Sequence, residues 1–132
     1  MTLPSPQAWR AAAARHGELF DALDPGARIA LLARSAPQQM LLWEVGAGGV
    51  EARLAPFGGY AQCGADIALA ADDEALAAIG TAIDGELFDK LKSGIRSGHI
   101  VTFMLKRRCQ LEERGFDELL DALGFVFMGA CR

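Results

Sequence analysis

The stretch SGIRSGHIVTFMLK, residues 93–106, decides how the fold is interpreted. Two Ser-Gly pairs lead into a strongly apolar run, and His99 lies where the two meet. In an extended chain successive side chains point to opposite faces, so Thr102 and Phe103 belong to different sides of this run. Because both sides are largely apolar, the run predicts a strand that is covered on both faces or lies beside a cavity.

Four further strands are expected upstream of this run. Each is a short apolar segment bounded by turn residues, and the third alternates apolar and charged positions. The segments cover residues 27–34, 38–45, 50–54 and 65–72. The GAGG sequence at 46–49 predicts a hairpin turn, because glycine tolerates the positive φ of tight turns. Strands joined by hairpins predict a mainly antiparallel sheet.

Helices are expected on either side of these strands. Ser5 and Pro6 are a typical helix start, and an apolar stripe continues from Trp9 to Leu23. Three more helices are expected over residues 72–83, 84–94 and 115–124, with Gly94 as a C-terminal stop. The order predicts an α+β fold in which helices cover a mainly antiparallel five-stranded sheet. A length of 132 residues favours one domain over 1–132.

Composition excludes several classes of protein. The chain is 52% hydrophobic and 23% charged, with a net charge of −4, which argues against a nucleic-acid partner. No apolar run approaches the roughly 18–20 residues of a membrane span, and the start lacks a signal-peptide pattern. We therefore expect a cytoplasmic protein without stable membrane insertion. The short basic cluster Lys106-Arg107-Arg108 is expected to be a solvated strand end, with a phosphate or lipid-headgroup patch as the alternative.

The sequence offers little that is typical of catalysis or metal binding. Cys63, Cys109 and Cys131 form no CxxC pair or zinc pattern and are expected to be reduced thiols. The acids at 72–74 are placed to start a helix, where its dipole favours negative charge. His99, near two serines, is the best candidate for a catalytic base, although a turn histidine is the simpler interpretation. We accordingly predict no catalytic residue, metal or cofactor.

Residues 49–106 resemble the sterol carrier protein 2 family in motif order. The similar segments are GVEARLAP (49–56), then ADIALAADDEALAAIG (65–80), then GELFDKLKSGIRSGHIVTFMLK (85–106). In the last segment Gly94 and Gly98 match the two spaced glycines of the family, whereas His99 stands where the family is often acidic. The resemblance implies an apolar ligand, such as a sterol, fatty acid or acyl-CoA, held between sheet and helices. It implies binding and carries over no catalytic residue.

The resulting hypothesis is a non-catalytic carrier for a hydrophobic small molecule. Large apolar side chains opposite many alanines are expected to line its cavity, as Phe88, Leu91, Ile95, Val101, Phe103, Leu105, Phe116 and Leu120. The alternative is an interaction module with a filled core that forms a homodimer through the apolar tail at 125–132. A small enzyme that uses His99 as a base is the third hypothesis.

Overall fold

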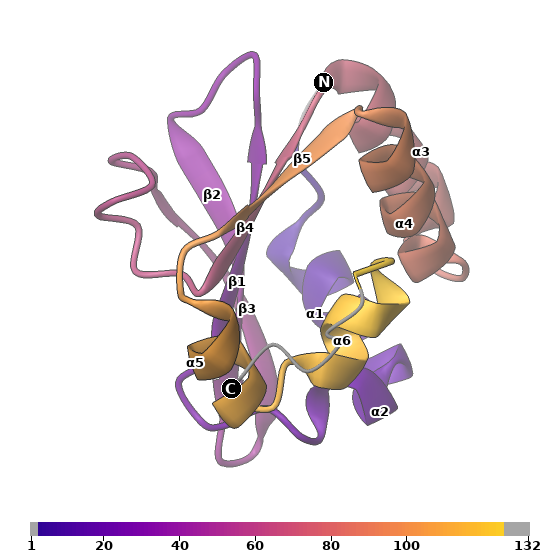
Figure 1. The fold of residues 1–132 in the computed structure, drawn as a ribbon. Coiled ribbons are helices and arrows are strands. Elements are labelled where there is room, and N and C mark those ends of the chain that lie inside the picture. The colour runs from indigo at the N-terminus through magenta and orange to yellow at the C-terminus, as the bar shows by residue number, and fades with distance from the viewer. Residues whose placement is uncertain (1–2, 126–132) are drawn as a thin grey trace.

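The computed structural model describes residues 3–125, and a five-stranded sheet runs through its centre (Figure 1). The strands are β1 (Arg28–Ala33), β2 (Gln39–Gly46), β3 (Gly49–Pro56), β4 (Ile67–Ala71) and β5 (Ile100–Met104). Their order across the sheet is β3-β2-β1-β4-β5. Three neighbouring pairs are antiparallel and one is parallel, so the expected α+β class and mainly antiparallel sheet are confirmed.

The position of β4 in the sheet differs from the one that a simple series of hairpins would give it. β4 lies between β1 and β5 and pairs with β1 in parallel, so the sheet is mixed. The chain leaves β3 at one edge of the sheet, and residues 57–66 carry it across to β4. Every residue of β4 is buried, as befits a strand in the interior of a sheet with both faces covered. The crossover therefore follows from the need to bury both faces of β4.

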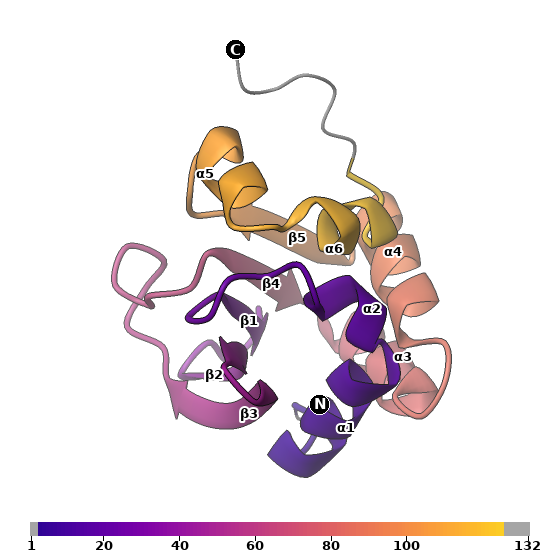
Figure 2. The ribbon, with the colours of Figure 1, turned by 90° about the horizontal axis from the view of Figure 1, so that it is seen from below.

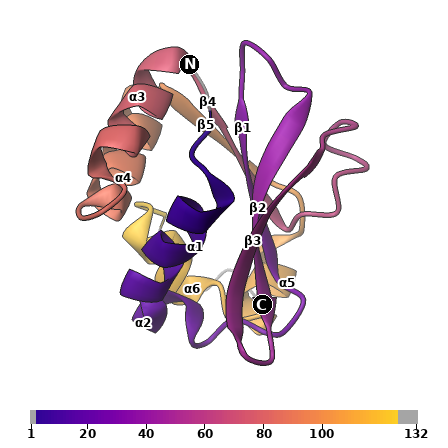
Figure 3. The same cartoon turned by 180° about the vertical axis from the view of Figure 1, so that it is seen from behind.

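Most of the helices lie together on one face of the sheet, and the 57–66 connection lies on the other (Figures 2 and 3). The helices are α1 (Pro6–Arg15), α2 (Gly17–Phe20), α3 (Asp73–Ala82), α4 (Leu87–Ser97), α5 (Arg108–Glu113) and α6 (Asp117–Ala122). The short α5 lies at one end of the sheet, away from the α3–α4 pair (Figure 1). The two layers protect both faces of the central strands from water.

Three helix boundaries differ from those expected. The first helix breaks at His16 into α1 and α2. The helix expected over 115–124 is the shorter α6, and α5 is an additional helix that precedes it. α4 runs through Gly94 and ends at Gly98, which has φ +87°. Gly94 is instead a packing position, since a Cβ there would lie 2.7 Å from Cδ1 of Ile100. Its small size lets α4 approach β5 closely.

The sheet separates two apolar layers. The larger lies under the helices and contains both tryptophans and most of the buried leucines. The smaller lies under the 57–66 connection and is built on alanines of β1 and β4, with Leu32, Met40 and Leu42. Alternation along the strands sends successive side chains to different layers. Both faces of the last strand are apolar, with Ile100 in one layer and Phe103 against the other. The expected cover on both faces is not found, because β5 is an edge strand in which Val101 is exposed and residues 102–104 are only partly buried.

No helix within residues 3–125 is both long enough and apolar enough to cross a bilayer. Of the tail expected to mediate a homodimer, Phe125 packs against the larger core. The rest of that tail, residues 126–132, lies outside the described residues.

Candidate functional site

A groove of about 820 Å³ lies between the first two helices and the β2–β3 turn. Half of the residues that line it are glycine or alanine. On the helical side these are Ala11, Ala13, Ala14 and Gly17, and on the other side they are the four residues of the turn, 46–49. Because alanine and glycine fill little volume, space remains between the helix and the turn.

The buried part of the groove is apolar. It is formed by the buried side chains of Phe20, Leu23 and Val45 and by the partly buried side chain of Val50. Val45 and Val50 are direct cross-strand partners, which places both on the helix-covered face. The sequence thus supplies an apolar base beneath small-residue walls, an arrangement typical of sites for apolar ligands.

A stack of aromatic rings packs behind this groove. The indoles of Trp9 and Trp43 are parallel, with centroids 3.9 Å apart. Phe20 meets Trp43 edge-on with ring centroids 5.1 Å apart, and Phe88 is nearly parallel to Trp43 with centroids 6.0 Å apart. Trp43 Nε1 donates a 2.7 Å hydrogen bond to the carbonyl oxygen of Trp9. Since Phe20 belongs to both the stack and the groove, the stack provides a rigid support for the apolar base.

The polar residues of the groove lie at its exposed margin. They are Gln7, Arg10 and Asp21. Arg10 Nε lies 3.3 Å from Glu51 Oε2, and both side chains are more than half exposed. An exposed pair of this kind contributes little to stability, so the guanidinium is able to leave Glu51 for a negatively charged group at the margin.

The structure places the eight predicted ligand-binding residues on both sides of the sheet. Five of them belong to the larger core under the helices: Phe88, Leu91, Phe116 and Leu120 are buried, and Ile95 is partly buried. Val101, Phe103 and Leu105 lie on the opposite face of β5. The eight are therefore not brought around one space, and none of them lines the groove.

The groove was missed because its signals are weak in the sequence. GAGG at 46–49 is a normal hairpin turn, and alanines in α1 are normal helix residues. The alanines of α1 and the GAGG turn form a groove only because they face each other, and α1 precedes the turn by some thirty residues. The sequence signal that could have indicated the groove was the presence of these two runs of small residues.

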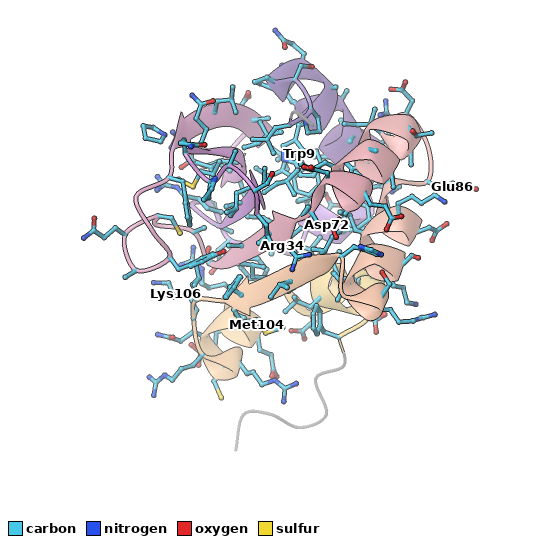
Figure 4. The ribbon with its side chains drawn as sticks, turned by 90° about the horizontal axis from the view of Figure 1, so that it is seen from above. Trp9, Arg34, Asp72, Glu86, Met104 and Lys106 are labelled. Atoms are coloured by element: carbon cyan, nitrogen blue, oxygen red, sulfur yellow. The ribbon has the colours of Figure 1, made fainter. Side chains whose placement is uncertain are left out.

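A second polar cluster surrounds His99 at the start of β5. His99 Nδ1 lies 2.6 Å from Asp72 Oδ2, and Nε2 lies 2.6 Å from Glu74 Oε2. Arg34 donates to the carbonyl oxygens of Gly98 and His99 and lies 3.3 Å from Asp72 Oδ2. Figure 4 shows Arg34 and Asp72 side by side at this end of the sheet. The cluster fastens the end of β1, the start of α3 and the start of β5 to one another.

The electrostatics of this cluster favour the imidazolium form. The hydrogen bond to Asp72, with the negative charges of Asp72 and Glu74, raises the pKa of His99 above 6.5. The backbone N–H of Ala75 and the histidine lower the pKa of Asp72. Both ring nitrogens face carboxylates, whereas a catalytic base needs a free one. Within residues 3–125 no group of three or more His, Cys, Asp or Glu side chains is arranged to hold a metal ion. The cluster is best explained as a structural one, which holds β1, α3 and β5 together through hydrogen bonds and ion pairs.

The cysteines are placed differently from one another. Cys63 is a buried free thiol whose Sγ lies 3.5 Å from the carbonyl oxygen of Tyr60. Cys109 is disulfide-bonded, so the expectation of a reduced thiol is wrong there. The expectation for Cys131 falls outside the described residues.

The sequence matches no family model and no curated protein. The resemblance to the sterol carrier protein 2 family therefore remains a prediction. The groove and the His99 cluster have to be interpreted from their own chemistry.

Proposed function

We propose that the protein binds and carries a hydrophobic small molecule, such as a fatty acid or another acyl or isoprenoid-like lipid, in the groove between α1, α2 and the β2–β3 turn. The observation that carries this proposal is a space of about 820 Å³ with small-residue walls and an apolar base. Its size falls within the range of roughly 300–1,000 Å³ that is typical of small-molecule sites.

The energetics of an acyl chain are sufficient for useful binding. Burial contributes about 0.8 kcal/mol per methylene, so about ten buried methylenes contribute about 8 kcal/mol. Association and ordering cost several kcal/mol of this, so the remaining gain of about 4 kcal/mol corresponds to roughly millimolar affinity from ten methylenes, and each further buried methylene strengthens it. Arg10 at the margin adds an attraction for a ligand that ends in a carboxylate. A long-chain fatty acid therefore suits the groove, since its acyl chain fits the apolar base and its carboxylate fits the margin at Arg10.

The chemistry of the lining favours binding over turnover. Its three polar side chains are Gln7, Arg10 and Asp21, all at exposed positions of the helical segment. The lining contains neither a histidine nor a serine or cysteine that an adjacent base would activate. The groove is thus suited to holding a ligand unchanged.

The test is to fill the groove with a large side chain. We expect Ala11→Trp and Ala14→Trp to weaken uptake of a fluorescent fatty acid by roughly tenfold or more, because the indole takes the space of the ligand. Ala77→Trp on α3 is the matched control, since Ala77 is exposed and lies outside the lining. Uptake is measured by fluorescence titration in the absence of vesicles.

A second variant separates the groove from the position first expected from the sequence. Phe103→Asp changes the opposite face of the sheet and is expected to leave uptake unchanged in folded protein. Loss of uptake in Phe103→Asp, together with normal uptake in both groove variants, would move the site away from the groove. A wild-type protein that takes up no probe at all would refute the carrier function.

A further inference from the structure

The face of β5 that points away from the helices carries an unusual row of apolar side chains. Val101, Phe103 and Leu105 alternate with residues of the helix-covered face. Two rings of the crossover connection continue the row: Tyr60 stacks on Phe103 at 4.0 Å, and Phe57 meets Tyr60 edge-on at 5.1 Å. We call these five residues the β5 strip.

The β5 strip is only partly covered. Val101 is 37% exposed, and the other four side chains are neither fully buried nor fully exposed. Among residues 3–125, α3 and α4 lie on the other face of the sheet, and the short α5 lies at the end of β5 (Figures 1, 2 and 3). Contiguous apolar side chains that water reaches are candidates for a surface that meets another apolar phase.

Positive charge borders the β5 strip. Lys106, Arg107 and Arg108 follow Leu105 directly and are exposed. Figure 4 shows Lys106 at the end of β5, on the side of the molecule where the crossover connection lies. The acids nearest in sequence, Glu112 and Glu113, come at the far end of α5. The border is therefore basic in a chain whose net charge is negative.

Charge is also divided between the two layers of the whole chain. The strand-bearing segments 25–66 and 98–108 contain six Lys and Arg against three Asp and Glu. The remaining, mainly helical segments contain seven against fourteen. On the exposed sheet face, Glu44 is held by Arg28 at 2.6 Å and Arg53 at 3.5 Å, so its charge is neutralised locally. Arg28 and Arg53 pair with Glu44, and Arg34 pairs with Asp72, so an anionic surface is attracted mainly to the basic segment 106–108.

We propose that the β5 strip and its basic border form a peripheral docking surface for an anionic lipid bilayer. Tyrosine and other partly apolar side chains favour the membrane–water interface, and each Lys or Arg near an anionic bilayer contributes about 1 kcal/mol. Binding of this kind is reversible and falls with salt. The surface extends the proposed function, because a lipid carrier exchanges its ligand with membranes, but it consists of different residues.

The bilayer fits these observations better than two other occupants. A nucleic acid would need a longer basic track than three residues, and it would leave the apolar row unused. An acidic partner protein would satisfy the charges, but partly exposed rings beside lysine and arginine are the pattern of interfacial anchors. A second copy of the chain would place like-charged borders near each other in a symmetric contact.

The experiment is co-sedimentation of the full chain with vesicles of phosphatidylcholine alone or mixed with phosphatidylserine, at low and high salt. We expect sedimentation only with the mixed vesicles, and its loss at high salt. The double variant Lys106→Glu/Arg107→Glu is expected to bind the mixed vesicles at least roughly tenfold more weakly than the wild type. Lys90→Glu/Arg96→Glu is the matched control, since both residues are exposed on α4 and the charge change is the same. The control is expected to bind as the wild type does.

A third variant tests the apolar part. Val101→Asp changes an exposed side chain, so folding should survive, and we expect it to reduce sedimentation severalfold. Equal losses in the border and control variants, or absence of sedimentation with mixed vesicles, would overturn the proposal. A dimer in light scattering that Val101→Asp dissociates, without vesicle binding by the wild type, would assign the strip to a second copy instead.

Failure of this proposal is distinguishable from failure of the carrier function. Uptake of the fluorescent fatty acid is measured without vesicles and depends on the groove. Normal uptake with no sedimentation rejects only the docking surface. Sedimentation with no uptake rejects only the carrier function.

Discussion

At the scale of single residues, Gly115 is fixed by two independent constraints. Its φ of +85° lies in the left-handed region, which side chains with a Cβ avoid. A Cβ at this position would also lie 1.8 Å from the carbonyl oxygen of Ala22. That carbonyl belongs to backbone, which cannot rotate away as a flexible side chain can. Gly115 therefore separates α5 from α6 and lets the link between them pack against the segment after α2.

We predict that Gly115→Ala is strongly destabilising, by about 3 kcal/mol or more, because backbone must move as well as adopt strain. Gly80→Ala is the control, since Gly80 is exposed within α3 and has open space around it. That control is expected to stabilise by about 0.5–1 kcal/mol through helix propensity. Urea unfolding followed by circular dichroism measures both. Similar small effects at the two positions would contradict the close approach at Gly115.

The second prediction at residue scale concerns pH and His99. A pKa raised in the folded state gives stability that is fully present below the ordinary histidine pKa of 6.5 and is lost as pH rises through the raised value. We therefore expect His99→Gln to destabilise the protein at about pH 6 and to have a smaller effect at about pH 9. The measurement is the urea midpoint as a function of pH.

Asp72→Asn tests whether this pH dependence comes from the observed pair. Asp72 is the main cause of the raised pKa of His99, so its neutral variant should flatten the difference between the two pH values. The lowered pKa of Asp72 gives stability that is present above about 3.8 and is lost on further acidification, so the two residues act at opposite ends of the pH range. A His99→Gln effect on stability that is independent of pH would rule out a stabilising charged pair between His99 and Asp72.

At the scale of elements, α1 is held on the sheet by one side chain above all. Trp9 is fully buried against Trp43, in the larger core. Its own Nε1 is buried and has no hydrogen-bond partner, whereas Nε1 of Trp43 is paired with the carbonyl of Trp9. The two indoles thus stack alike but differ in what their N–H groups contribute. The attachment of α1 depends on apolar packing at Trp9.

We predict that Trp9→Ala costs about 3–5 kcal/mol, as is usual for truncating a large buried aromatic. Trp9→Phe is expected to cost clearly less than Trp43→Phe, because it removes a donor that has no partner and keeps a ring in the stack. Denaturant unfolding of the three variants provides the comparison. The reverse order of the two phenylalanine variants would show that Trp9 Nε1 has a partner in solution.

At the scale of the whole molecule, local patterns and tertiary packing determined different things. All five strands and most helices were predictable, because each has its own periodicity, cap or turn residues within a short window. The short apolar run at 65–72 indicated a strand, but nothing local specified β1 as its parallel neighbour. That pairing is a contact between segments far apart in the chain, and it depends on where the crossover connection places β4.

The candidate site shows the same division. The sequence by itself determined an α+β chain with an apolar interior of large apolar side chains and many alanines, and a basic cluster after the last strand. Tertiary structure alone decided that α1 faces the GAGG turn, that the eight expected residues are divided by the sheet, and that His99 meets two carboxylates. The physical reason is that periodicity fixes which way a side chain points within its own element, whereas a site requires two elements to meet, and their meeting is selected by the burial of the whole core.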